Sequence, residues 1–163
     1  MVTSLDLIKQ ESADSVSSFT ISDIFSANYD IYKVFIRGNG SQSVSSITAE
    51  FLDSGGSDIA TGNYNYGIFR LDTTTTFGDV YGTGGNSFEF AYTSATDNDF
   101  SALITVYNPF STSGYTFCEV QGMSVQGQRS VIMAKSSTSA TSMKFWANQN
   151  FTPITVAVYG VKG

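Results

Sequence analysis

Hydrophobic and polar residues alternate along most of the chain with the period of two that is typical of half-buried β-strands. The clearest segment, 87–93, places large aromatic residues on one side and small or polar residues on the other. The same pattern recurs in segments 15–21, 29–37, 45–53, 64–71, 100–107, 115–121, 129–134, 142–146 and 154–159. About ten short strands separated by turns are typical of a β-sandwich or barrel. We therefore predict an all-β fold, a two-sheet antiparallel sandwich of the jelly-roll type.

Glycine, serine, asparagine and aspartate separate these segments, as in 37–41, 53–57 and 82–86, and they suit turns that need positive φ. A length of 163 residues suits one domain. We expect a single sandwich domain over 16–163 and an N-terminal arm over 1–15, in which 3–11 is a short helix or extended. The predicted core consists of Phe19, Val34, Ile36, Phe51, Phe88, Phe90, Ile104, Val106, Val156 and Val158.

Charged residues make up only 13% of the chain, about half the usual share. Neutral strand faces suit burial against other subunits, because small uncharged side chains lose little hydration energy. An ordinary sandwich that carries hydroxyls instead of charges would show the same composition. If the faces are buried, the expected interface residues are Leu5, Leu7, Ile8, Ser87, Ala91 and Thr93.

The net charge is −6, and the eight lysines and arginines are scattered along the chain. Because nucleic-acid binding needs a clustered positive surface, we expect no nucleic-acid partner. No apolar run approaches the ~20 residues of a membrane-spanning helix, so we expect no membrane partner. Residues 1–16 lack the basic and apolar parts of a signal peptide, which predicts synthesis in a cytoplasm. The single cysteine, Cys118, lies in an apolar run and is expected to be a buried, unreactive thiol.

The absence of histidine excludes His-dependent catalytic triads and His-ligated zinc. A glycosidase needs paired carboxylates, whereas Glu50, Glu89 and Glu119 each stand alone on a predicted strand. We therefore predict that the chain is not an enzyme and needs no cofactor. Calcium is the one metal with candidate ligands, in the loops 97–99 and 53–58.

Aromatic residues near strand ends are candidates for a sugar-binding platform, although core or interface packing would use the same residue types. These residues are Tyr64, Tyr66, Tyr81, Tyr115 and Trp146.

Two stretches carry a resemblance to known proteins: 16–34, which contains the sequence FSANYDIYKV, and 155–162, which ends in YGVK. With the intervening FLDSGG and NYNYG, they resemble small jelly-roll virion proteins of tailed bacteriophages, especially marine and cyanobacterial phages. The resemblance implies a multi-copy component of the virion, made in the host cytoplasm and bound to other virion proteins such as the major capsid protein. It implies either a capsid decoration (cement) protein that stabilises the head, or a tail-fibre or receptor-binding, lectin-like module. The common symmetry of such components implies a homotrimer.

Overall fold

The computed structural model describes residues 4–40, 45–71, 77–93, 99–124 and 126–162, and over these ranges the chain is all-β without a helix. The strands are β1 (Ser4–Ala13), β2 (Val16–Ile21), β3 (Ile31–Gly40), β4 (Ser45–Leu52), β5 (Tyr64–Leu71), β6 (Phe77–Gly85), β7 (Phe88–Thr93), β8 (Asp99–Tyr107), β9 (Thr116–Met123), β10 (Gly127–Ala134) and β11 (Ser142–Lys162). The pairings between these strands are antiparallel. The predicted all-β, antiparallel class is confirmed.

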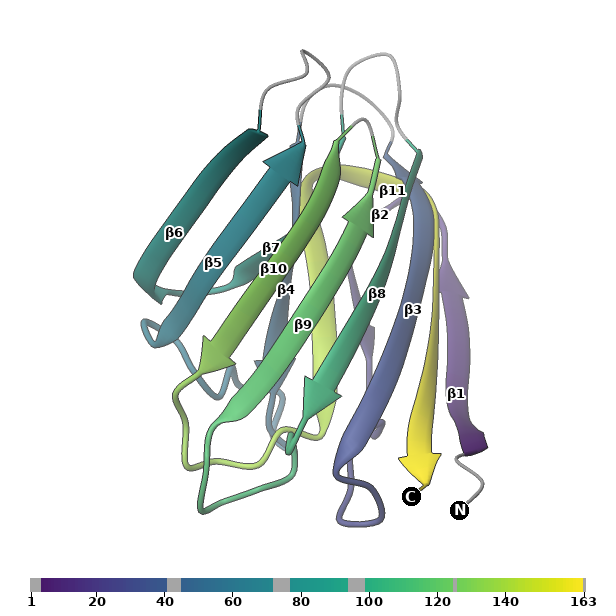
Figure 1. Cartoon of the computed structure of the whole chain (residues 1–163). Helices are drawn as coiled ribbons and strands as arrows, with labels where there is room; N and C mark the ends of the chain where they lie inside the picture. Colours follow the sequence, from purple (N-terminus) through teal and green to yellow (C-terminus); the bar gives the residue numbers. More distant parts are fainter. Residues whose placement is uncertain (1–3, 41–44, 72–76, 94–98, 125, 163) are drawn as a thin grey trace.

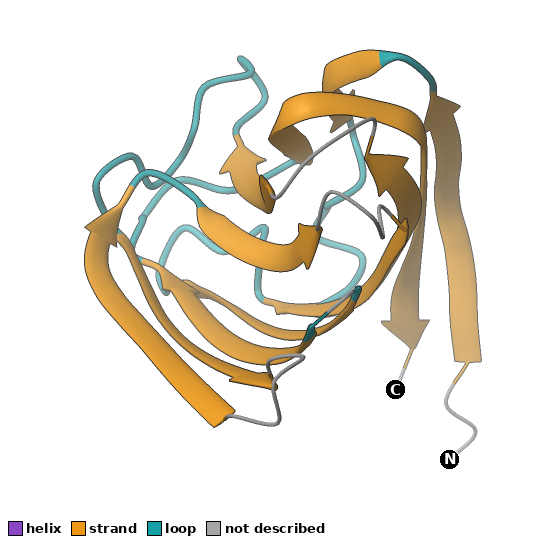
Figure 2. Ribbon diagram, turned by 90° about the horizontal axis from the view of Figure 1, so that it is seen from above, coloured by secondary structure: helices purple, strands orange, loops and turns teal. Residues whose placement is uncertain are grey.

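The strands form one hydrogen-bonded sheet in the order β6-β5-β10-β9-β8-β3-β11-β4-β7, with β1 and β2 also paired to β11 (Figure 1). The sheet curls strongly around a central interior and approaches a barrel in shape (Figure 2). This curvature brings β7 across the interior to lie against β8, β9 and β10. The interior therefore lies between the β7 end of the sheet and the strands β8, β9 and β10 of the same sheet.

The longest strand, β11, lies between β3 and β4 in the sheet and changes partners along its length. Its first part pairs with β2 and β4, and its second part pairs with β1 and β3. The sequence pattern predicted two strands here, 142–146 and 154–159, because a proline normally interrupts a ladder. The structure instead has one continuous strand that includes Pro153. The partner strands of β11 change around Phe151, where its register shifts.

The N-terminal segment expected to be an arm is paired along its length, from Ser4 opposite Lys162 to Ala13 opposite Ile154. The two phage-like stretches meet beside it. The ring of Tyr29 covers Gly160 so closely that a Cβ at that position would lie 2.6 Å from the ring. The Tyr29 hydroxyl donates a hydrogen bond to Asp6 at 2.9 Å, and Asp6 also pairs with Lys162 at 2.5 Å.

The predicted core residues are buried, except that Phe19 is half-buried and packs against the core. Tyr64 is fully buried with them and lies between Phe51 and Phe88, with ring centroids 6.5 and 5.8 Å away. A bundle of aromatic rings thus fills the end of the interior that β4, β5 and β7 enclose.

A β-bulge in β7 overturns part of the interface prediction. The β4–β7 register shifts between Ile47 and Thr48, so the alternation of β7 changes by one residue beyond Phe90. As a result, Ala91 and Thr93 turn into the interior and are only 1% and 2% exposed. The prediction that these two side chains lie on an interface is wrong.

Candidate functional site

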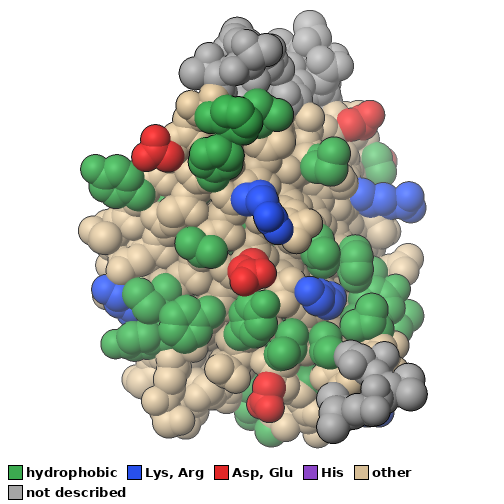
Figure 3. Space-filling model, viewed as in Figure 1, with side chains coloured by type: hydrophobic (Ala, Val, Ile, Leu, Met, Phe, Trp, Pro, Cys, Tyr) green, Lys and Arg blue, Asp and Glu red, His purple; other side chains and the backbone are tan. Residues whose placement is uncertain are grey.

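The outer face of the sheet, from β6 across to β1, is unusually apolar for an uncovered surface. Burial alternates strictly along β9, so one set of side chains fills the interior and the other set faces outward. The exposed large apolar residues on this face are Leu5, Leu7, Phe35, Phe69, Leu71, Phe77, Tyr81, Phe117, Met123 and Val131. Figure 3 shows hydrophobic side chains spread over β5, β10, β9, β8 and β3, with only isolated charges between them. Extended apolar surfaces of this kind mark binding sites.

One part of this face lies over β8, β3, β11 and β1. We call Leu5, Leu7, Phe35, Leu103 and Tyr159 the attachment patch. Leu103 is the direct cross-strand neighbour of Phe35, and Phe35 meets the edge of the Tyr159 ring at 5.6 Å between centroids.

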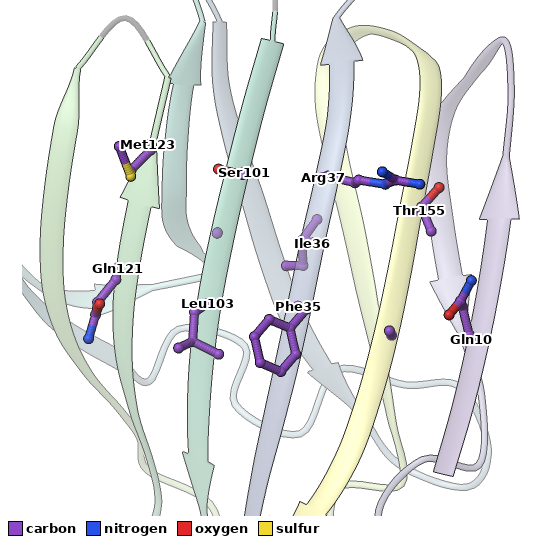
Figure 4. A pocket seen from close by; sticks show the side chains of 11 residues that line it. Gln10, Phe35, Ile36, Arg37, Ser101, Leu103, Gln121, Met123 and Thr155 are labelled. Carbon is purple, nitrogen blue, oxygen red and sulfur yellow. The ribbon is translucent and has the colours of Figure 1, made fainter. Parts of the chain in front are cut away.

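A groove of about 470 Å³ shares Phe35 and Leu103 with this patch and extends to Gln121 and Met123 on β9 (Figure 4). Phe35 and Leu103 project side by side from adjacent strands, and Arg37 extends toward Thr155 on β11. The Arg37 side chain forms no ion pair within the described residues. This part of the face therefore combines an apolar centre with a free positive charge.

A second groove, of about 550 Å³, crosses β6, β5, β10 and β9, and we call it the β6–β9 groove. Its outward-facing side chains are Phe69, Asp79, Tyr81, Glu119, Gln121, Arg129 and Val131, together with Gly67. They form two rows across the strands: Asp79–Phe69–Arg129–Gln121 and Tyr81–Gly67–Val131–Glu119. The floor of the groove therefore carries both aromatic side chains, Phe69 and Tyr81, and ionisable ones, Asp79, Glu119 and Arg129.

Sequence reasoning missed both grooves, because it assigned one apolar side to each strand. A signal was present: β3 carries Phe35 between Val34 and Ile36, and β10 carries Val131 beside Ile132. A strand that is apolar on both sides is typical of a sheet covered on both faces.

The interior holds a polar cluster beside a small cavity of about 200 Å³. Arg70 pairs with Glu89, lies 5.7 Å from the ring of Tyr92, and faces this cavity. The amide of the buried Gln128 donates to the Glu89 carbonyl oxygen and to the Ser130 hydroxyl, each at 3.1 Å. The cluster thus links β5, β7 and β10 across the interior.

The five aromatic residues predicted as a sugar platform do not come together. Tyr64 is in the core, where its hydroxyl accepts from the Phe51 N–H at 2.8 Å and donates to Asp58 at 2.9 Å. Burial raises the pKa of Tyr64 far above its ordinary value. Tyr66 is half-buried beside Gly82. The platform prediction fails for Tyr64 because its ring fills the core.

The remaining platform and interface residues are dispersed. Tyr81 is 83% exposed on the outer face, Tyr115 is exposed before β9, and Trp146 is half-buried on β11. Among the predicted interface residues, Leu5 and Leu7 are exposed on β1, whereas Ile8 packs against the core. Ile8 follows Leu7 directly in β1, so its side chain lies on the opposite side of the strand. Ser87 lies half-buried in the β6–β7 turn.

The carboxylates singled out from the sequence have different surroundings. Glu50 pairs with Lys144 at 2.7 Å, while Glu119 faces outward in the β6–β9 groove. Asp53 accepts hydrogen bonds from the N–H groups of Gly55 and Ser57 and so stabilises its own turn.

Within the described residues, no group of three potential ligands is placed to hold a metal ion. In the candidate calcium loop 97–99, residues 97 and 98 lie outside the described residues. The described residues also contain no helix that could span a membrane. Cys118 is buried, and burial raises the pKa of its thiol well above the usual range.

No family model matches the chain, and no curated protein matches it. Among solved structures, it is similar to an exo-inulinase from Aspergillus awamori, with 14% identity, 96% of this chain and 29% of that chain covered, and a TM-score of 0.48. It is also similar to a β-fructofuranosidase from Schwanniomyces occidentalis, with 7% identity and a TM-score of 0.34. That match covers 96% of this chain and 34% of the fructofuranosidase. A structure of infectious bursal disease virus, Gt strain, has 11% identity, coverage of 95% and 38%, and a TM-score of 0.20. The chain spans about a third of the length of these proteins.

These comparisons contradict the prediction that the chain is not an enzyme, since the first three similar structures are an exo-inulinase and two fructofuranosidases. That prediction is wrong. The absence of histidine, one of its two grounds, excludes only the mechanisms that need an imidazole. The activities named for those structures belong to those proteins, and at these TM-scores the likeness assigns no activity to this chain.

Proposed function

We propose that the chain is a structural component of a bacteriophage particle, held on another particle protein through the attachment patch. The observation that carries this proposal is the uncovered apolar patch on β8, β3, β11 and β1. Leu5, Leu7 and Phe35 are 50%, 55% and 42% exposed. Burying such side chains against a partner stabilises a complex by about 25 cal/mol for each Å² of apolar surface removed from water.

The phage-like stretches support the same proposal, because both contribute strands to this part of the sheet. Residues 29–34 lead into β3, and residues 155–162 form the second part of β11. Tyr29 and Gly160, one from each stretch, are in direct contact. These parts of the two terminal stretches therefore lie together and support the patch.

The charges around the patch indicate what kind of partner surface would fit. Arg37 is exposed beside Phe35, and Lys33, on the same side of β3, donates a hydrogen bond to Thr105 at 2.7 Å. A partner with an apolar centre and one or two carboxylates at its rim would complement this arrangement. We propose the major capsid protein as that partner, which makes the chain a capsid decoration protein.

The finer assignments belong to the same proposal. A jelly-roll arrangement of two layers is supported by β7 lying across the interior from β8, β9 and β10. A homotrimer located in the virion follows from the phage resemblance. A tail-fibre or receptor-binding module is the alternative role, and the exposed aromatic residues of the β6–β9 groove favour it.

The test is incorporation into particles. Purified particles carrying the wild-type chain, a Phe35→Asp variant or a Leu7→Asp variant are compared by quantitative mass spectrometry. We expect each patch variant to lose at least about tenfold in particle-bound copies, because a charge would be buried at the interface. Tyr115→Asp, an exposed residue outside the patch, is the matched control and should be retained.

The copy number separates the two roles. A decoration protein is present at one or more copies for every few shell subunits, whereas a fibre component is present in far fewer. If particles contain none of the chain, or if the patch variants are incorporated as well as the control, the proposal is wrong.

A further inference from the structure

Gly67 opens a gap in the floor of the β6–β9 groove that folding does not require. It lies in the interior of β5, pairs with Tyr81 on one side and Val131 on the other, and has no positive φ. A Cβ at this position would have only Val131 Cγ2 within 4 Å, at 3.8 Å, so alanine would fit without a clash. A glycine inside a strand weakens it and often marks close approach of a ligand or another chain.

The aromatic side chains around this gap leave it open. Tyr81, the direct neighbour of Gly67, is 83% exposed, and its ring does not lie over the glycine. Phe69 is 51% exposed and stacks on Phe77 at 5.1 Å between centroids. Two aromatic rings therefore flank an open position on the sheet.

The polar groups of the groove are unused by the protein itself. Asp79, Glu119 and Arg129 face outward and form no hydrogen bond or ion pair with other described residues. Free carboxylates accept hydrogen bonds and a guanidinium donates them, so the groove offers both kinds of partner. Two carboxylates and one guanidinium leave no excess of positive charge that would select an anionic ligand.

We propose that the β6–β9 groove binds a neutral polysaccharide. A sugar ring presents C–H groups that pack on aromatic faces and hydroxyls that bond to carboxylate, amide and guanidinium groups. Neither a purely apolar ligand nor a nucleic acid would satisfy this set, because the first leaves the ionisable groups unpaired and the second needs a positive surface. The groove crosses three inter-strand spacings, roughly 14 Å, which suits a short run of sugar units.

This site is separate from the attachment patch. The patch lies on β8, β3, β11 and β1, whereas Tyr81, Gly67 and Val131 lie on β6, β5 and β10. Binding of a polysaccharide therefore does not require attachment to a particle, and either proposal can fail alone.

The experiment is affinity electrophoresis of the purified chain in gels that contain laminarin, dextran or galactomannan, with alginate as the anionic comparison. We expect at least one of the three neutral polymers to slow the wild-type chain, with little effect of added salt. Tyr81→Ala should weaken binding at least about tenfold, as expected for loss of a central aromatic contact. Gly67→Phe, which fills the gap, should weaken it similarly.

The controls make each result decisive. Tyr115→Ala removes an exposed tyrosine outside the groove and should bind like the wild type, and the folded state of each variant is checked by circular dichroism. The proposal is overturned if no neutral polymer slows the wild-type chain, or if alginate alone does. It is also overturned if Tyr81→Ala is folded and binds normally, or if light scattering shows that the groove variants instead abolish a dimer.

Discussion

Gly122→Ala tests how closely β7 approaches β9 across the interior. Gly122 lies on β9 and faces the interior, where an added Cβ would sit 2.1 Å from the carbonyl oxygen of Phe90 on β7. An ordinary contact needs at least 3.4 Å, so β7 must move away by more than 1 Å. The obstacle is backbone in a bulged strand, which cannot rotate aside as a side chain could.

The expected cost follows from two opposing effects. Overpacking of this kind destabilises a core by about 1–3 kcal/mol. Replacing glycine by alanine also lowers the conformational entropy of the unfolded chain. Where the backbone tolerates alanine, this stabilises the folded state by about 0.4–1 kcal/mol. We expect the free energy of unfolding to fall by about 1–2 kcal/mol, which lowers the melting temperature by about 2–8 °C in a domain of this size.

Urea unfolding monitored by the fluorescence of Trp146, the single tryptophan, measures this change. Gly78→Ala is the control, because an added Cβ there has no neighbour within 4 Å. The control should be neutral or slightly more stable than the wild type. If Gly122→Ala unfolds at the same urea concentration as this control, β7 does not pack on β9 and the account of the interior is refuted.

Three further predictions concern individual side chains. Tyr64→Phe should lower the free energy of unfolding by about 1–3 kcal/mol, because it leaves the buried Phe51 N–H without its acceptor; an unchanged urea midpoint would contradict this. The Cys118 thiol should react with Ellman's reagent at pH 8 only in denaturant, since burial raises its pKa and keeps it protonated; rapid reaction of the native chain would show the assignment to be wrong. Hydrogen bonds from Lys162 and Tyr29 lower the pKa of Asp6 below its ordinary value of 3.8. The stability advantage of wild type over Asp6→Asn should therefore be complete well above pH 3.8 and disappear as the pH falls below it, which urea unfolding at several pH values measures.

The alternation of apolar residues predicted the strands and the core well where each strand keeps one register. It failed at β7, because a bulge is a property of the pairing between two strands and leaves no mark in either strand alone. It also missed β6, because residues 82–86 were assigned to a turn and Gly78 has no side chain that could show the alternation. β6 is held in place by its pairing with β5, a tertiary interaction that overrides the low strand propensity of glycine.

The candidate sites were harder to predict than the fold. Nothing in the sequence distinguishes Tyr64 from Tyr81. Tyr64 is nevertheless fully buried in the core, whereas Tyr81 is 83% exposed. Which face of a strand meets the interior depends on register, and the registers here depend on partners far away in the sequence. The grooves arise from side chains of β5, β6, β9 and β10 together, so no single segment contains their pattern.

The position of β11 in the chain has a consequence for biosynthesis. β1, β2, β3 and β4 all pair with β11, and β11 follows every one of its partners in the sequence. While a ribosome is still making residues 142–162, those four strands lack a neighbour and expose apolar surface that the finished sheet covers. Native pairing across such long separations is slow, because the loops between the strands must close first. The nascent chain therefore has to avoid aggregation until β11 emerges, and we expect its yield to depend on chaperones that hold exposed strands.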